Sequence, residues 1–195
     1  MPIAVRTQTN RSVRRRFLEA QQQQRRETWR AVQAVSRRRR QSAWLALQSA
    51  HQRRATQILG VFDAEVRNVT TSPLATFLLH YICCEALGKL LIGSRDNIPP
   101  YKILQYRGTK IGLKKLKPAI HRLGSPVSDT VLETIFLRDR ETAGERSCRA
   151  LRNAILHELQ SDHLAEVNRR ITELTKDMKD FIEGIRVQSG AGHVF

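Results

Sequence analysis

The C-terminal third of the chain carries its most regular hydrophobic pattern. Between residues 164 and 185, apolar residues recur at alternating steps of three and four positions, and charged residues fill the intervening positions. The apolar positions are Leu164, Val167, Ile171, Leu174, Met178, Phe181 and Ile185. Such spacing forms one apolar stripe along an α-helix. We therefore expect a long amphipathic helix that packs along a neighbouring helix, either in the same chain or in a second one.

A second segment, residues 73–92, is apolar at nearly every position, which predicts a buried central helix. Ser72 followed by Pro73 is a favourable helix start, and Gly93 is a typical end. Glu85 lies within the apolar stripe of this helix. Because a buried carboxylate is costly unless it is paired, Glu85 is expected to pair with Lys89, one turn later, or with an arginine of another helix.

The first part of the chain has helix-forming residues but a weaker apolar pattern. Residues 8–68 contain no proline, and their first glycine is Gly60. One apolar stripe runs from Trp44 to Phe62, whereas before Trp44 apolar residues are sparse and arginine and glutamine dominate. We predict a helical arm over residues 1–43, weakly packed and dependent on a partner for its order. A bundle domain over 44–188 and a flexible tail over 189–195 follow.

The connecting segments predict shorter elements. Residues 95–112 are expected to form a loop, because Pro99 and Pro100 interrupt them. Tyr101 and Tyr106 in that loop either stack on single-stranded nucleic acid or simply pack the loop onto the domain. Short helices are expected over 113–123 and after Ser128. The predicted fold is all-α, a helical bundle of four to five main helices with a long N-terminal helix.

The positive charge of the chain is concentrated in and next to the predicted arm, which suggests a function for that arm. The net charge is +16, and residues 1–60 contribute +12 of it, with fourteen basic and two acidic side chains. All fourteen are arginines, which bind phosphate groups with two parallel hydrogen bonds. RNA or DNA is therefore the expected partner, and a merely solvated basic helix is the alternative. The candidate nucleic-acid-binding residues are Arg37, Arg38, Arg39, Arg40, Arg53, Arg54 and Arg149.

Cysteine usage and hydropathy favour a cytoplasmic protein. The three cysteines form no CxxC pair and have no zinc-site spacing, and Cys83 and Cys84 adjoin each other inside an apolar run. They are expected to be small buried residues in a reducing compartment. No run of eighteen uncharged apolar residues occurs, so no membrane partner is expected. The arginine-rich start also resembles an organellar transit peptide, which remains the alternative.

The candidate chemistry lies in residues 148–159, CRALRNAILHEL. Asn153 and His157 are four positions apart, so they project within about 40° of each other on an ideal helix. Arg152 is five positions before His157 and projects about 140° away from it. Leu151, Ile155, Leu156 and Leu159 are expected to anchor the other side. From spacing alone, this is either the solvated face of an ordinary helix or a small reaction centre.

Arg152, Asn153 and His157 resemble the signature of the HEPN superfamily. That signature is an arginine, four to six intervening residues and a histidine, commonly with a polar residue directly after the arginine. Four residues separate Arg152 from His157 here. The segment LLHYICCEALGKLL, residues 78–91, is similar to the apolar inner helix of these domains, where a glutamate is common. The resemblance covers about residues 44–185.

The resemblance implies a ribonuclease that uses no metal and no cofactor. HEPN domains typically dimerise with two motifs facing one cleft, so a homodimer is implied, as is a toxin or phage-defence role with a possible protein antitoxin or other regulatory partner. His157 would move the proton, and Arg152 would neutralise the phosphoryl charge. Asn153 would orient the histidine or the phosphate, and Glu85 would hold Arg152 in place. Leu159 replaces a tyrosine that antitoxin-paired families carry, so regulation through that tyrosine is not supported. A non-catalytic nucleic-acid-binding or assembly protein is the alternative.

Overall fold

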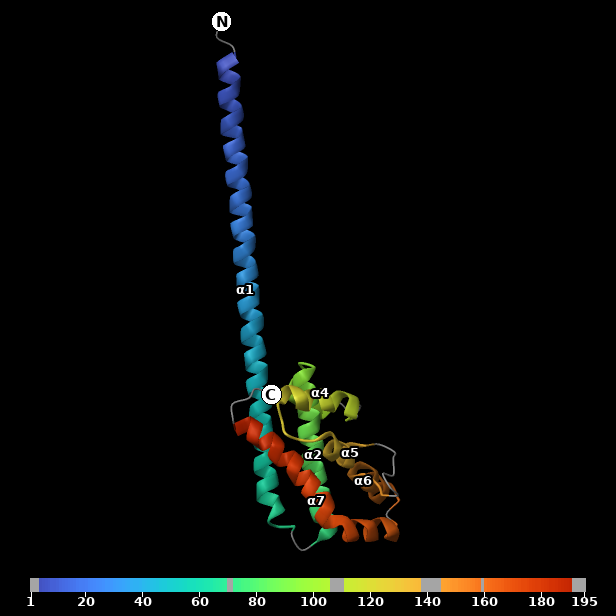
Figure 1. Cartoon of the computed structure of the whole chain (residues 1–195). Helices are drawn as coiled ribbons and strands as arrows, with labels where there is room; N and C mark the ends of the chain where they lie inside the picture. The colour runs from blue at the N-terminus through green and yellow to red at the C-terminus, as the bar shows by residue number, and fades with distance from the viewer. Residues whose placement is uncertain (1–3, 70–71, 106–110, 138–144, 159, 191–195) are drawn as a thin grey trace. The chain divides into compact units, whose positions relative to one another are not determined.

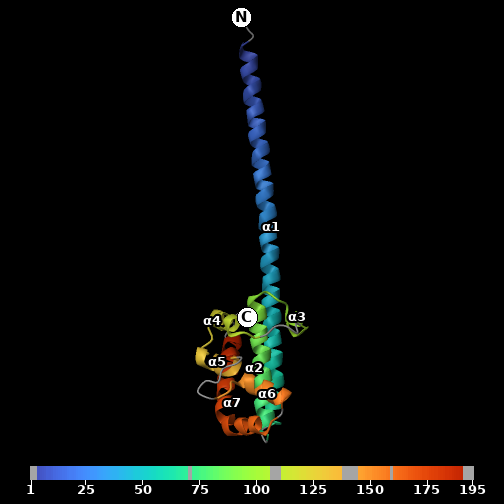
Figure 2. The same cartoon turned by 90° about the vertical axis from the view of Figure 1, so that its right-hand side faces the viewer.

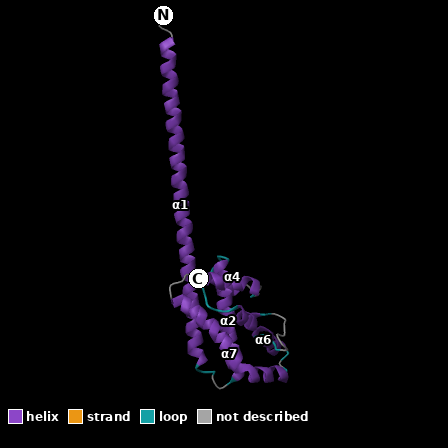
Figure 3. Ribbon diagram, in the orientation of Figure 1, coloured by secondary structure: helices purple, strands orange, loops and turns teal. Residues whose placement is uncertain are grey.

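The protein is mostly helical. The computed structural model describes residues 4–69, 72–105, 111–137, 145–158 and 160–190, and these contain seven α-helices and no strand (Figure 3). In chain order the helices are α1 (Ala4–Val66), α2 (Pro73–Arg95), α3 (Pro100–Gln105), α4 (Leu113–Leu123), α5 (Asp129–Phe136), α6 (Cys148–His157) and α7 (Ser161–Gly190) (Figure 1). The all-α prediction is confirmed. The predicted number of four to five main helices is not confirmed, since the described residues form seven helices, of which α3, α5 and α6 have ten residues or fewer.

The chain divides into two units, residues 1–45 and 46–195, and α1 runs through both. The boundary falls two residues beyond the predicted end of the arm. Described side chains of the first unit, from residue 22 onwards, are exposed on all sides of the helix apart from the partly buried Gln33. Trp29, Val32 and Val35 are 64, 63 and 52% exposed. An apolar pattern too sparse to form a stripe thus gives a helix with no buried face.

The core of the second unit forms around α2 and α7, which share its most extensive helix–helix contacts and lie side by side (Figures 1 and 2). Five positions of the predicted C-terminal stripe are fully buried, namely Val167, Leu174, Met178, Phe181 and Ile185. The Phe181 ring meets the Phe136 ring of α5 edge-on, with 5.4 Å between centroids. The stripe therefore packs against helices of its own chain, which resolves the alternative left open by the sequence.

The second half of α1 belongs to this core. Ala55 and Phe62 of the stripe predicted from Trp44 onwards are buried, and so is Leu59, which was not part of it, whereas Trp44 itself is 39% exposed. His51 is buried as well, with its ring nitrogens 2.8 Å from the Leu47 carbonyl and 2.9 Å from the Ile98 carbonyl. The second half of α1 thus packs against α2 through apolar contacts such as the Phe62 ring on the His80 ring, and His51 links it to the segment that follows α2.

The boundaries of α2 confirm its predicted start and correct its predicted end. The Ser72 hydroxyl accepts a hydrogen bond from the Ala75 N–H at 3.3 Å, and Pro73 begins the helix. The helix then continues through Gly93 to Arg95 and ends where Asn97 adopts a left-handed conformation, with φ of 55°. The Ile98 N–H donates to the Gly93 carbonyl at 2.8 Å, closing the end of the helix. A Cβ at Gly93 would overlap Ile103, so this glycine permits close packing of α3 and does not stop the helix.

The burial of α2 accounts for its composition. By length and mean hydropathy, 1.5 over its most apolar window, α2 alone among the described helices could cross a membrane. In the structure 56% of that window is buried within the unit, as in the core helix of a bundle. The expectation that the protein has no membrane partner stays a prediction.

The predicted loop over 95–112 contains the short helix α3, so the proline pair starts a helix there instead of only interrupting one. Tyr101 is 63% exposed, whereas Tyr106 lies outside the described residues. The predicted cap of α5 is confirmed, because the Ser128 hydroxyl accepts from the Val131 N–H at 3.3 Å. Helix α7 continues to Gly190, and the rest of the predicted tail lies outside the described residues.

Candidate active site

The start of α6, which carries the candidate motif, is fixed by a serine with two hydrogen bonds. The Ser147 hydroxyl accepts from the Ala150 N–H at 3.2 Å and donates to the Leu137 carbonyl at 2.6 Å. The first bond caps the helix, and the second ties that cap to the end of α5. The two hydrogen bonds of Ser147 thus fix the start of α6 relative to α5, in addition to the packing of its apolar side.

An ion-pair cluster from α7 holds the residue before this cap. Glu166 accepts from the backbone N–H of Arg146 at 3.1 Å and from its guanidinium at 2.9 Å. Arg170, only 6% exposed, donates to the Arg146 carbonyl at 2.8 Å and to Glu166 at 3.0 Å. Burial alone would raise the pKa of Glu166, but the hydrogen bonds from Arg146 and Arg170 outweigh it and hold the pKa below its ordinary value. No sequence pattern linked Arg146 to this cluster, because it lies 20 positions from Glu166 and 24 from Arg170.

The apolar side of α6 is anchored as predicted, with one exception. Leu151 and Ile155 are buried, at 0 and 2% exposure, and Cys148 is fully buried beside them. Leu156, predicted to join them, is instead 56% exposed. It lies about 100° from Ile155 around the helix, which carries it past the edge of the buried face. Leu159 lies outside the described residues.

Arg152 points from α6 toward α2 and is held by three groups. Its Nη1 donates to the Asn153 Oδ1 at 2.8 Å, and its Nη2 lies 3.7 Å from the Glu85 Oε2. The guanidinium carbon also lies 5.8 Å from the centroid of the Tyr81 ring, within the range of a cation–π contact. With 31% of its side chain exposed, Arg152 keeps part of its guanidinium accessible to solvent.

Glu85 makes both of the contacts that the sequence left as alternatives. Its Oε1 lies 2.7 Å from the Lys89 Nζ, one turn later in α2, and its Oε2 faces Arg152. The carboxylate is 22% exposed, so it lies at the edge of the core and not within it. Glu85 and Asn153 therefore fix the direction of the Arg152 guanidinium from two helices.

Tyr81 is a member of this group that sequence reasoning did not select. It is 3% exposed, and burial raises its pKa well above the ordinary value, with the nearby Glu85 charge adding to the rise. The phenol therefore stays protonated, and its ring contributes a face to Arg152. The signal was available, because Tyr81 and Glu85 are four positions apart and share one face of α2.

His157 stands apart from these groups. It is the last residue of α6 and is exposed, and its imidazole makes no hydrogen bond or ion pair with another residue of the described part of the chain. Because α6 is a regular helix over its length, the imidazole projects about 140° away from Arg152. Within one chain the structure thus brings together Arg152, Asn153 and Glu85, but not His157.

The candidate nucleic-acid-binding arginines fall into two groups. Arg37, Arg38, Arg39, Arg40 and Arg53 are exposed on α1, where their guanidinium groups face solvent. Arg54 and Arg149 are partly buried and hydrogen-bonded: Arg54 donates to the Gln57 side chain at 3.1 Å, and Arg149 donates to the Ile111 carbonyl at 2.6 Å. Arg149 therefore also joins α6 to the segment that precedes α4.

The three cysteines and His163 of the second unit are buried in the bundle. Cys83, Cys84 and Cys148 are free and buried, as predicted, and burial raises the pKa of Cys83 and of Cys148 to about 12. His163 is 2% exposed, and its Nε2 lies 3.8 Å from Asp162 and 4.0 Å from Glu158. Over the described ranges, no group of three or more histidine, cysteine or acidic side chains lies together as a metal-ion site would require.

Comparison with known proteins found no matching family model, no similar curated protein and no similar solved structure. The site is therefore interpreted from its own residues.

Proposed function

We propose that the protein is a metal-independent RNA endonuclease of the HEPN kind, which acts as a homodimer in the cytoplasm. The observation that carries the proposal is the environment of Arg152. Its guanidinium is oriented by Glu85 and Asn153, while part of it stays accessible to solvent. An arginine held in this way is suited to bind a phosphodiester oxygen and to stabilise the charge that develops there.

The chemistry needs no group beyond these side chains. The ribose 2′-hydroxyl attacks the adjacent phosphorus, the bond to the 5′-oxygen breaks, and a 2′,3′-cyclic phosphate and a 5′-hydroxyl result. An imidazole exchanges protons at physiological pH, so His157 takes the proton of the 2′-hydroxyl and returns it to the leaving 5′-oxygen. Arg152 neutralises the phosphoryl charge, and Glu85 and Asn153 position Arg152.

The geometry of α6 supports the homodimer in this proposal. Arg152 and His157 of one chain project in different directions, so one chain does not aim both at the same phosphate. A second copy that docks with its own α6 nearby supplies the missing group, so that His157 of one chain works with Arg152 of the other. The exposed Leu156, next to His157, gives such an interface an apolar contact.

The arm supplies substrate affinity in this proposal. Four consecutive arginines, Arg37 to Arg40, and Arg53 further along α1 offer phosphate contacts on several sides of a helix. Such contacts hold RNA without reading its sequence. A toxin or phage-defence effector controlled by a protein partner fits a nuclease of this kind.

A non-catalytic nucleic-acid-binding protein is the second candidate, and the exposed imidazole of His157 favours it. A histidine without a partner among the described residues, one and a half turns from Arg152, is also what the solvated end of an ordinary helix presents. In that case α1 would bind RNA, and the bundle would serve only for assembly.

The experiment that separates the two is incubation of the full chain with total RNA in excess EDTA. The nuclease proposal expects cleavage to continue, with cyclic phosphate at the new 3′ ends. His157→Ala is expected to abolish cleavage and to leave RNA binding intact. His121→Ala is the matched control, because His121 is also an exposed histidine, 67% accessible, on another helix. Equal cleavage by the His157 variant and the parent would refute the assignment, and the absence of any cleavage by the parent would favour the binding protein.

A further inference from the structure

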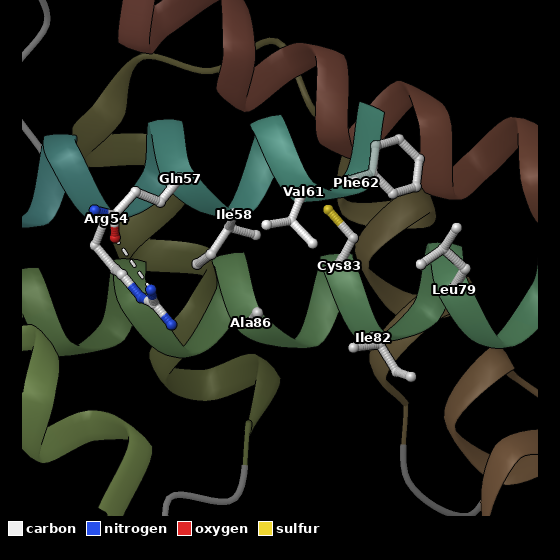
Figure 4. A pocket seen from close by; sticks show the side chains of 9 residues that line it. All are labelled: Arg54, Gln57, Ile58, Val61, Phe62, Leu79, Ile82, Cys83 and Ala86. Atoms are coloured by element: carbon white, nitrogen blue, oxygen red, sulfur yellow. Dashed lines mark hydrogen bonds between the residues drawn. The ribbon is translucent and has the colours of Figure 1, made fainter. Parts of the chain in front are cut away.

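An open groove runs between the second half of α1 and the facing side of α2, away from the candidate active site. Figure 4 shows the residues that line its apolar part, which has a volume of about 210 Å³. Helix α1 contributes Ile58, Val61 and Phe62, and α2 contributes Leu79, Ile82, Cys83 and Ala86. On each helix these positions follow steps of three and four, so each presents one stripe to the groove.

Two of these side chains leave an apolar surface in contact with water. Val61 is 64% exposed and Ile82 is 57% exposed, although both stand on helices whose other faces are buried in the core. Such exposure shows that the depression is open along its length and is not a closed cavity. An open apolar groove between two helices suits a third helix that lies along it better than a small molecule, which a protein normally encloses.

The groove changes character toward one end. A second depression of about 400 Å³ shares Arg54 and Gln57 with the first and adds Arg53, Pro100 and Tyr101. From Arg53 to Phe62 the groove follows about 14 Å of α1, or two and a half helical turns. An occupant that matches both parts is therefore apolar where it contacts Val61 and Ile82. It carries negative charge where it contacts the two arginines.

The charge at that end is not balanced by an acidic side chain of the described residues. Neither Arg53 nor Arg54 makes an ion pair with a residue of the described ranges, and the lining of both depressions includes no acidic side chain. The Arg54 Nε is buried and lacks a hydrogen-bond acceptor in the described structure. An unsatisfied buried donor is costly, and a carboxylate bound in the groove would balance the charge of the guanidinium that carries it.

We propose that this groove binds an acidic amphipathic helix of a protein partner, with the apolar stripe of the partner on Val61 and Ile82 and its carboxylates on Arg53 and Arg54. Charge complementarity selects this occupant over a second copy of the chain, whose net charge of +16 would place like charges near the arginine end. The proposal does not depend on nuclease activity, because the groove shares no residue with the candidate active site, and it shares only Arg53 with the proposed RNA contacts of α1.

The test uses the full chain and a fluorescent, lactam-stapled peptide of roughly four helical turns, with leucines along one stripe and glutamates elsewhere. Fluorescence anisotropy is expected to give a dissociation constant in the micromolar range, with a lysine-for-glutamate version of the peptide binding at least tenfold more weakly. Val61→Glu and Ile82→Glu are each expected to weaken binding of the acidic peptide at least tenfold. Both positions are exposed, so these changes leave the core packing in place.

Val32→Glu is the matched control. Val32 is also a valine of α1, 63% exposed against 64% for Val61, but it lies in the other unit, and its substitution is expected to change affinity less than twofold. Reversing the charge with Arg53→Glu and Arg54→Glu together is expected to exchange the preference, so that the lysine peptide binds better than the glutamate peptide.

Three results would overturn the proposal. The first is binding of the acidic peptide that Val61→Glu and Ile82→Glu leave unchanged. The second is an equal loss on Val32→Glu, which would mean general attraction to a basic chain. The third is no peptide binding together with a loss of self-association on Ile82→Glu, measured by sedimentation, because the groove would then belong to a second copy.

Discussion

The two halves of α1 have similar helix-forming composition and opposite environments. Residues 22–45 are exposed on nearly all sides, whereas residues 46–66 bury a stripe that includes Ala55 and Leu59. Both halves form one uninterrupted helix, so helix propensity does not distinguish them. The regular spacing of apolar residues after Trp44 does, because only a continuous stripe repays the entropy lost when side chains are fixed in a core.

The difference also separates two kinds of function. A helix with no buried stripe is free to present arginines in every direction, which suits contact with a flexible polyanion. A packed bundle can hold an arginine such as Arg152 in one orientation, because partners from two helices fix it. Under the proposed function, the arm provides affinity and the bundle provides chemistry.

The sharpest contrast between the two units is the cost of removing an aromatic ring. Phe181→Ala removes a fully buried ring that contacts Phe136, and it is expected to lower the free energy of unfolding by about 3–5 kcal/mol. Trp29→Ala removes a larger ring that is 64% exposed and is expected to cost less than about 0.5 kcal/mol. Urea unfolding followed by circular dichroism measures both. A large cost at Trp29 would mean that the arm packs against something in solution.

Removal of the arm is expected to affect RNA binding and not the stability of the bundle. Deleting residues 1–43 removes twelve arginines and two acidic residues. Affinity for single-stranded RNA at low salt is expected to fall on the order of 100-fold, and the dependence of affinity on salt is expected to become less steep. The urea midpoint of the bundle should stay unchanged.

The matched control keeps the positive charge of the arm but replaces guanidinium groups with ammonium groups. Replacing Arg37, Arg38, Arg39 and Arg40 with lysines retains four positive charges but loses bidentate hydrogen bonding to phosphate, so a loss of only a few-fold is expected. Undiminished binding by the deletion variant, measured by filter retention, would remove the arm from the proposed function.

A smaller effect concerns the ion pair that joins the packed half of α1 to α7. Arg186 donates to both oxygens of Asp63, each at 2.8 Å, and these hydrogen bonds lower the pKa of Asp63 below its ordinary value of 3.8. Because the folded-state pKa is the lower one, the stabilisation is complete above the unfolded-state value and is lost as the pH falls through the folded-state value. Both side chains are at least a third exposed, so the pair is worth at most about 1 kcal/mol.

Arg186→Gln tests this contribution through its pH dependence. The variant is expected to be slightly less stable than the parent at pH 7, and the difference should shrink as the pH drops below 4. Urea unfolding at a series of pH values measures it. A difference that is the same at pH 7 and at pH 2.5 would assign the effect to lost packing of the arginine stem and not to charge.

The smallest predicted effect is a gain in stability. Gly60 lies inside α1, and a Cβ at that position would meet no atom within 4 Å. Gly60→Ala is therefore expected to stabilise the packed half of α1 by up to about 1 kcal/mol, because alanine loses less backbone entropy on entering a helix. Thermal unfolding measures the gain. A loss of stability would show that this face of α1 is covered in solution by a part of the protein that the described residues do not include.

Much of the fold could be predicted because it depends on local patterns. The serine caps of α2 and α5, the buried stripe of α7 and the buried cysteines all follow from residue type and spacing. The end of α2 could not, because the role of Gly93 depends on Ile103, which approaches from α3. The helical conformation of α1 before residue 44 follows from its helix-forming composition and its lack of proline and glycine.

The candidate site could be predicted only in part. Glu85 and Arg152 were selected from separate segments, and the structure brings them within 3.7 Å of each other. The contact of Arg149 with Ile111 and the cluster around Arg170 depend on residues far apart in sequence, which periodicity does not reveal. Among the described residues, no arginine of the same chain lies beside the His157 imidazole. In the proposed dimer, Arg152 of the second copy takes that place.

The most direct test of the proposed function is therefore complementation between two inactive chains. Arg152→Ala and His157→Ala variants are mixed under conditions that let subunits exchange, and RNA cleavage is measured in EDTA. If each site combines residues of two chains, half of the dimers are mixed and each contains one intact site, so the mixture should regain about a quarter of the parent activity. A mixture that exchanges subunits but remains as inactive as either variant alone would contradict a site shared between two copies.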